Sequence, residues 1–221
     1  MIAVVAAVLG AIRRAPRRKD LTRLAILIAL GVPMQGVVGA IVVRTKLNPF
    51  ANQQHFLLSM VLVALGAALV HRAGEPDGVR RKQCVTRPSG MAVVAVVAMT
   101  AIALITGTFV TGAGPHAGDE TAKRFRVGIT TVARIHSLSV LATIALAMAL
   151  MWALRKRATD REVLDTALTS WMVVAVGQAA IGYTQYFTDV PAALVAIHVA
   201  AATALWLVTV RLWLSLTTAV A

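Results

Sequence analysis

The chain has 221 residues, of which 58% are hydrophobic and only 14% are charged. Soluble domains carry about 45–50% apolar and about 25% charged residues, so one globular core cannot bury this much apolar surface. The composition excludes a soluble enzyme, a disordered chain and, despite a net charge of +13, a nucleic-acid binder, whose basic residues gather on one folded face. A single cysteine, Cys84, excludes a disulfide within the chain. The chain is therefore predicted to be an integral membrane protein.

Six apolar stretches are long enough to cross a bilayer, which takes about 20 residues. In chain order they are residues 24–43, 53–70, 91–110, 128–154, 166–187 and 191–210. A seventh apolar run, residues 1–12, is only about half as long as a span. Its basic residues follow it, whereas those of a signal peptide precede the apolar stretch. We interpret this run as the end of a span whose beginning is missing.

Basic residues concentrate in alternate connecting segments. Residues 13–23 hold six of them, residues 71–90 hold five and residues 155–165 hold four, against five in the other connecting segments together. Short cytoplasmic loops collect Lys and Arg, so these three segments and the C-terminus are predicted to be cytoplasmic. The high net charge is then explained by topology and by contact with lipid headgroups.

Three histidines, His55, His136 and His198, fall inside predicted spans that all begin on the outer side. Each is therefore expected about one to two helical turns below the outer surface, in one layer. Histidines from facing helices of a bundle build axial haem or metal sites. The alternative for each is a hydrogen bond to a neighbouring helix. Zinc and a proton relay are less favoured, because all nine Asp and Glu lie in loops or at helix ends.

The sequence around two of these histidines repeats. Residues 35–39 read QGVVG and residues 178–182 read QAAIG, and the glutamine of each segment precedes a histidine, His55 or His198, at the same spacing. The offset between the copies is 143, and a proline opens each histidine-bearing helix. Both pairs of spans run from inside to outside and back, which predicts a parallel repeat about an axis along the membrane normal. Alternatively, these small residues only pack helices together.

The same offset, applied to His136, points to a position seven places before Met1. Residues 3–25 align at that offset with the end of the His136 span and the loop after it. We therefore expect an all-α membrane protein of two pseudo-symmetric four-helix bundle halves, in which the first helix and the start of the second are absent. Residues 1–72 are interpreted as the remnant of the N-terminal half. A cytoplasmic linker is expected at 73–90 and the C-terminal half at 91–221.

Four motifs carry a resemblance to a known family: GTFVTGAGPHAGD at 107–119, ARIHSLS at 133–139, GYTQYFTDVPAALVAIH at 182–198 and LNPFANQQHFLLSM at 47–60. With these motifs the chain resembles the haem A synthase family, whose members oxidise a methyl group of haem O to the formyl group of haem A for terminal oxidases. The resemblance implies a haem b between His136 and His198. It also implies that His55 matches the second histidine of the N-terminal half, where the substrate, haem O, is expected.

The chain departs from the family pattern in two outer loops. The family's catalytic carboxylate lies in a first outer loop that would precede Met1, so no catalytic residue is assigned. The second outer loop, residues 111–126, has no cysteine. Within the membrane, Arg134 is a candidate partner for a haem propionate, although it can also extend to the interface. His116 is a candidate residue over the mouth of the site, or else an exposed turn residue.

The resemblance implies membrane lipid, haem O, haem O synthase and an unidentified electron donor as partners, in a multi-pass plasma-membrane protein. Its C-terminus is expected in the cytoplasm and its haem layer towards the outer face. A homo-oligomer is possible from the sequence, and nucleic acid is not expected as a partner. Two other hypotheses remain: a non-enzymatic b-type cytochrome subunit that passes electrons, and a haem-free transporter or scaffold in which the histidines only pack.

Overall fold

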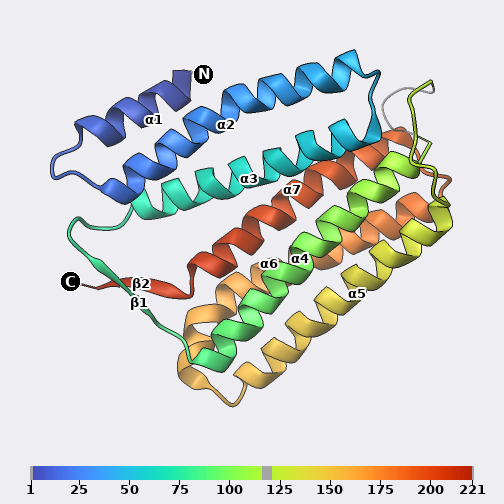
Figure 1. Ribbon diagram of the computed structural model, residues 1–221. Coiled ribbons are helices and arrows are strands. Elements are labelled where there is room, and N and C mark those ends of the chain that lie inside the picture. The colour runs from blue at the N-terminus through green and yellow to red at the C-terminus, as the bar shows by residue number, and fades with distance from the viewer. Residues whose placement is uncertain (1, 116–120, 221) are drawn as a thin grey trace.

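The computed structural model describes residues 2–115 and 121–220 (Figure 1). These residues form helices joined by short connections, with one pair of short strands. The elements are α1 (Ile2–Arg13), α2 (Lys19–Arg44), α3 (Pro49–Ala73), β1 (Arg80–Gln83), α4 (Arg87–Ala113), α5 (Ile129–Leu154), α6 (Ala158–Phe187), α7 (Ala192–Leu214) and β2 (Thr217–Val220).

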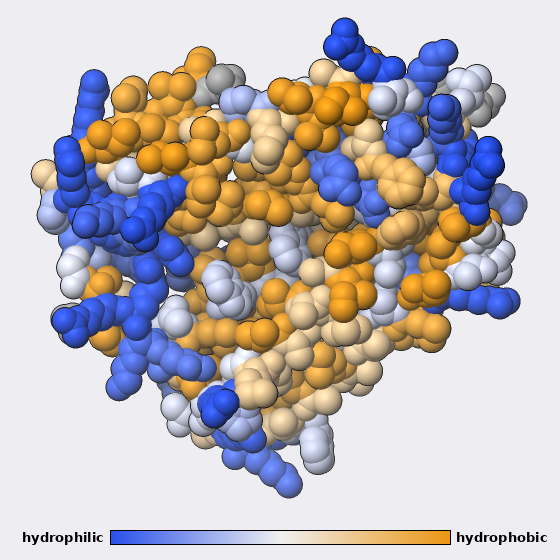
Figure 2. All heavy atoms as spheres, in the orientation of Figure 1, coloured by the Kyte–Doolittle hydropathy of each residue, from blue (hydrophilic) through white to orange (hydrophobic). Residues whose placement is uncertain are grey.

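Six of the described helices, α2 to α7, are long and apolar enough to cross a membrane. They contain or closely match the six predicted spans, and the short run at residues 1–12 forms α1 beside α2 (Figure 1). Apolar side chains cover most of the middle of the surface, whereas hydrophilic ones gather mainly at its left and right edges, where the helices end (Figure 2). The protein is therefore a multi-pass helical membrane protein, as predicted.

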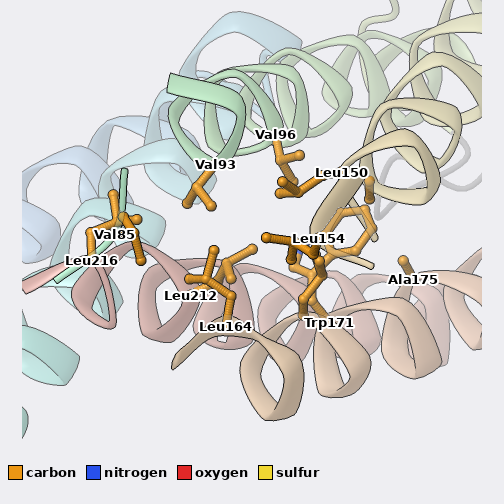
Figure 3. Close-up of a cluster of buried hydrophobic side chains, with 12 residues drawn as sticks. Val85, Val93, Val96, Leu150, Leu154, Leu164, Trp171, Ala175, Leu212 and Leu216 are labelled. Atoms are coloured by element: carbon orange, nitrogen blue, oxygen red, sulfur yellow. The ribbon is translucent and has the colours of Figure 1, made fainter. Parts of the chain in front are cut away.

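The C-terminal half, α4 to α7, is a four-helix bundle whose main core lies near one end. Buried side chains from all four helices meet there (Figure 3). Trp171 of α6 is the largest side chain of this core. It is 1% exposed and donates its indole N–H to Thr209 Oγ1 of α7 at 2.9 Å. The members of this core that lie on the four helices include Val93, Val96, Leu150, Leu154, Leu164, Leu168, Trp171 and Leu212. Apolar packing therefore holds the bundle at this end and leaves the other end free for a cavity.

The predicted repeat is visible in the burial pattern. Three of the six buried positions of α1 and α2 are also buried at the equivalent position of the second copy, in α5 and α6. These pairs are Ala11 with Leu154, Leu21 with Leu164, and Ala25 with Leu168. Helices α1 to α3 therefore correspond to the end of α5 and to α6 and α7, and the two copies share part of their buried faces. The boundaries at 72/73 and 90/91 stay a prediction.

The turns that precede the two histidine-bearing helices are also repeated. Thr45 and Thr188 end α2 and α6, and each hydroxyl donates to the carbonyl four positions earlier, at 2.7 and 2.8 Å. The two residues after each threonine adopt φ between 53° and 58°, which is uncommon for residues other than glycine. They are Lys46 and Leu47, and Asp189 and Val190. The prolines depart from the offset: Pro49 is the first residue of α3, whereas Pro191 is the N-cap of α7.

The three basic connecting segments and the C-terminus lie at one end of the molecule. The buried Arg18 donates to the carbonyl oxygens of Arg72 and Glu75, both at 3.0 Å, which joins the first segment to the second. Asp160, 2% exposed, accepts a hydrogen bond from the backbone N–H of Thr86 at 2.9 Å, which joins the third segment to the start of α4. Strands β1 and β2 pair antiparallel and join the second segment to the C-terminus.

Candidate functional site

A cavity of about 1080 Å³ occupies the end of the bundle away from its apolar core. Residues of α3, α4, α5, α6 and α7 line it, including His136 of α5 and His198 of α7. The ring centres of these two histidines are 6.4 Å apart, and the ring planes are nearly perpendicular at 88°. Two of the three histidines predicted from the sequence therefore face each other across one cavity.

Each of the three histidines lies against a glycine of a neighbouring helix. A Cβ atom built on the glycine would lie close to the histidine Cε1, at 3.1 Å for Gly107, 2.9 Å for Gly182 and 3.1 Å for Gly39. The pairs are Gly107 with His136, Gly182 with His198, and Gly39 with His55. A side chain at any of these positions would push the ring away, because ordinary contacts at a Cβ begin at about 3.4 Å. Each ring can therefore lie at its observed position only because the neighbouring residue is a glycine without a side chain.

Hydrogen bonds orient the ring of His136. Its Nδ1 lies 3.2 Å from Thr106 Oγ1. The threonine hydroxyl has backbone acceptors within reach, the carbonyls of Ile102 and Ala103, both at 3.0 Å, so its oxygen can accept the Nδ1–H of the histidine. Ser139 Oγ lies 3.1 Å from the same threonine oxygen and donates to the His136 carbonyl at 2.7 Å. This arrangement leaves the Nε2 of His136 for a ligand.

A glutamine contacts each histidine of the repeat. Gln178 Nε2 donates to the carbonyl of His198, and Gln35 Nε2 donates to the carbonyl of His55, both at 2.9 Å. Within the described part of the chain, the Oε1 atoms of both glutamines and the Nδ1 atoms of both histidines are buried without a hydrogen-bond partner. These contacts extend the repeat from the sequence to the hydrogen bonds around the rings.

His55 lies apart from the other two histidines. It contacts Gln35 and Gly39 of α2, whereas Gln53 and Phe56 of the same helix line the cavity that holds the other pair. Helix α3 is therefore a wall between His55 and this cavity. Gln53 Nε2 donates to Thr108 Oγ1 of α4 at 2.7 Å, next to the glycine that contacts His136. This hydrogen bond brings the segment around His55 to the level of Gly107 and His136 along the bundle.

Two further residues were candidates from the sequence: Arg134 as a partner for a haem propionate and His116 over the mouth of the site. Arg134 lines the cavity and is exposed. His116 lies outside the described residues. The loop before α5 is held against α4, because Phe125 packs against Gly112 and its backbone N–H donates to the carbonyl of that glycine at 2.9 Å. The rings of Phe50 and Phe125 meet edge to face at 4.7 Å.

Sequence reasoning did not single out Thr106 or Ser139, which orient His136. Two signals were available. Thr106 directly precedes a glycine of the GTFVTGAG motif, and Ser139 ends the ARIHSLS motif. The spacing from Gly39 to His55, which is repeated from Gly182 to His198, also marked the glycine contacts.

The separation of the histidine pair is compatible with a haem, which the imidazoles of His136 and His198 would hold. A ring nitrogen binds a first-row metal at about 2.0–2.1 Å and lies about 1.1 Å from its ring centre, so opposed imidazoles have centres about 6 Å apart. The observed separation is 6.4 Å. The cavity, at about 1080 Å³, is slightly larger than the range of about 300–1,000 Å³ typical of ligand sites, which suits a large ligand. Among the described residues, no cluster of three or more His, Cys, Asp or Glu offers an alternative all-protein metal site.

Comparison with known proteins identifies the family. No curated protein matches the sequence. The family model COX15-CtaA, described as cytochrome oxidase assembly protein, matches residues 1–210, which is nearly the whole chain and includes all three histidines of the layer. This match agrees with the resemblance carried by the four sequence motifs. The chain therefore belongs to the COX15-CtaA family of cytochrome oxidase assembly proteins, the haem A synthase family.

Proposed function

We propose that this protein is a haem A synthase-type oxidoreductase, which oxidises the methyl group of haem O to the formyl group of haem A during cytochrome oxidase assembly. The observation that carries the proposal is the pair of facing histidines, His136 and His198, with ring centres 6.4 Å apart across a large cavity, in a chain of this family. The oxidation replaces two C–H bonds of the methyl carbon by a C=O bond, which is a four-electron oxidation. The oxygen atom and a redox partner come from outside this chain: the partner is an electron donor, as expected from the sequence, where O2 supplies the oxygen, and an electron acceptor where water does.

In this proposal His136 and His198 hold a haem b by their Nε2 atoms. When bound there, a haem with two imidazole ligands supplies one-electron transfer rather than oxygen binding. Thr106 keeps the proton of His136 on Nδ1, so that Nε2 is free to coordinate. Arg134, exposed at the cavity lining, is proposed to pair with a propionate. The cavity lining is mostly apolar, which suits the rest of the ring.

His55 is proposed to serve haem O in the N-terminal half. It has the same glycine and glutamine contacts as His198, which supports an equivalent role for its ring. Helix α3 alone separates this position from the cavity with the histidine pair. A haem b held by His136 and His198 would therefore lie across α3 from the substrate and would supply electron transfer there.

The proposed orientation puts the basic end of the molecule in the cytoplasm of a cell with the protein in its plasma membrane. The three basic segments and the C-terminus share that end, and the positive-inside rule assigns it to the cytoplasm. The histidine layer then lies towards the outer face. Proposed partners are membrane lipid, a haem O synthase that supplies the substrate and a separate electron carrier.

The test combines a spectrum with a cellular assay. The purified protein is expected to show a low-spin b-type haem spectrum that His136→Ala and His198→Ala each abolish. His71→Ala, a histidine beside Glu75 at the basic end, is the matched control and is expected to keep the spectrum. Cells without the gene are expected to lose haem A and accumulate haem O, and the wild-type gene is expected to restore haem A. A wild-type protein without haem, or an unchanged spectrum in both alanine variants, would overturn the ligand assignment.

The second candidate function is a b-type cytochrome subunit that only passes electrons. It is favoured by the difference between the halves: among the described residues, His136 and His198 form a facing pair, whereas His55 has no opposed histidine. This alternative predicts the same low-spin spectrum but no change in cellular haem A when the gene is deleted. The haem extraction therefore distinguishes the two functions.

A further inference from the structure

Gln178 is buried beside the proposed haem ligand His198. It lines the cavity and is 8% exposed, although it lies on a membrane-spanning helix where a polar side chain is costly to bury. Its Nε2 donates to the backbone carbonyl of His198 at 2.9 Å. Its Oε1 and the Nδ1 of His198 are both buried and both without a partner among the described residues. The amide N–H of Gln178 is therefore satisfied, whereas its carbonyl oxygen and the Nδ1 of the neighbouring histidine are each left without a partner.

The same arrangement occurs in the other copy of the repeat. Gln35 Nε2 donates to the carbonyl of His55 at 2.9 Å, and Gln35 Oε1 and His55 Nδ1 are likewise buried without a partner among the described residues. The glycine four residues after each glutamine also contacts the histidine in both copies. Other contacts of the glutamine differ: Gln35 Nε2 also donates to Ser59 Oγ and lies 3.5 Å from His55 Nε2, whereas the position equivalent to Ser59 is Ala202. The donation of the glutamine amide to the histidine carbonyl is therefore kept in both halves although its surroundings differ.

We propose that Gln178 is a positioning residue for His198: its amide N–H holds the His198 carbonyl, and its Oε1 accepts the Nδ1–H of the ring when Nε2 coordinates haem iron. This inference rests on the proposed function. A neutral histidine that binds metal through Nε2 carries its proton on Nδ1, and that N–H almost always has an acceptor. Thr106 is placed to fill this role for His136, and the proposal assigns the equivalent role for His198 to Gln178 Oε1, which is buried and has no other partner among the described residues.

The expected consequence is electronic as well as geometric. An acceptor on Nδ1–H raises the basicity of the coordinating nitrogen. A more basic ligand favours ferric over ferrous iron, so the hydrogen bond lowers the reduction potential. Removing a hydrogen-bond partner of this kind changes metal affinity by about 10–100-fold. A tenfold difference between the two oxidation states corresponds to about 59 mV for a one-electron couple.

The test is a redox titration of the full-length protein purified with its haem. It is done in a His55→Ala background, so that only the haem between His136 and His198 contributes. Gln178→Leu removes the acceptor and is expected to raise the midpoint potential, by about 59 mV for a tenfold effect. Gln178→Glu keeps an acceptor oxygen and is expected to give a potential at or below that of the parent. Gln35→Leu is the matched control, because it removes the equivalent glutamine of the other half, and the potential is expected to stay unchanged.

Opposite responses to leucine and glutamate identify the hydrogen bond, because a change in packing would move both potentials in one direction. Equal potentials in the parent and Gln178→Leu, or equal upward shifts in Gln178→Leu and Gln178→Glu, would overturn the inference. If Gln178→Leu does not fold, Gln178→Glu still tests the proposal, because a midpoint potential of this variant above that of the parent would contradict it. Failure of the proposed function looks different: the parent protein itself then lacks a low-spin haem that depends on His198.

Discussion

The contact between Gly182 and His198 makes a sharp test of the site. In Gly182→Ala the new Cβ would lie 2.9 Å from Cε1 of the histidine, whereas ordinary contacts at this atom begin at 3.4 Å. The ring must therefore move by about 0.5 Å or the two helices must separate. We expect the ring to move, because it ends a side chain that borders a cavity rather than packed atoms.

A movement of this size is expected to change the free energy of unfolding little, but to disturb haem coordination strongly. Overpacking a core costs about 1–3 kcal/mol, and a ring that can move into a cavity places the cost at the lower end. Metal–ligand distances, in contrast, are satisfied only within about ±0.2 Å. A displacement of about 0.5 Å exceeds this tolerance, so we expect Gly182→Ala to weaken haem binding about tenfold or more while the protein stays folded.

The assay is haem content and the low-spin absorption spectrum of the purified protein, with thermal unfolding as the measure of fold. The matched control is Gly177→Ala on the same helix, where a Cβ meets nothing within 4 Å. This control is expected to keep its haem and, because alanine is a better helix former, to gain about 0.5–1 kcal/mol of stability. Equal haem content in Gly182→Ala and Gly177→Ala would refute the argument that the glycine determines the position of the ring.

Three further predictions concern stability. Asp160→Asn is expected to lower the free energy of unfolding by about 1–3 kcal/mol. The reason is that the buried carboxylate accepts hydrogen bonds from the Thr86 N–H and from Ser89 Oγ, the latter at 2.6 Å. An unchanged melting temperature would contradict this prediction. The Arg81 guanidinium holds the pKa of Glu75 below its usual range, so this ion pair stabilises the fold fully above the unfolded pKa of about 4.5 and is lost as the pH falls through the lower folded pKa. Glu75→Gln should therefore melt more like the parent at pH 3 than at pH 6, and a difference independent of pH would count against it. Trp206→Phe removes the hydrogen bond that the indole N–H donates to a backbone carbonyl of α3 at 2.8 Å. We expect the free energy of unfolding to fall by about 0.5–1.5 kcal/mol, and equal melting curves for the variant and the parent would contradict this.

Several features of the fold follow from local sequence. The length and apolarity of each span indicated the six membrane helices, since a helix in lipid must satisfy its own backbone hydrogen bonds. The constant offset between the two copies indicated a repeat that the structure extends to paired buried positions, such as Leu21 with Leu164, and to the threonine caps Thr45 and Thr188. These features depend on composition and spacing along one helix, which a sequence displays directly.

Other features required the tertiary structure. The sequence placed His55, His136 and His198 in one layer, but only packing shows that the second and third face each other while α3 separates them from the first. The reason is rotational: depth along a helix can be counted in residues, whereas the direction in which a ring points depends on how neighbouring helices pack against it.

The same reasoning explains why Thr106 and the glycine contacts went unnoticed. Thr106 is ordinary in its own helix and becomes important only because α5 brings His136 within 3.2 Å of it. Gly107 and Gly182 read as small packing residues until the structure shows a histidine ring against each. By itself the sequence determined which residues are candidates and how deep they lie. The tertiary structure decided which of them meet, because contacts between helices depend on the packing of side chains far apart in the chain.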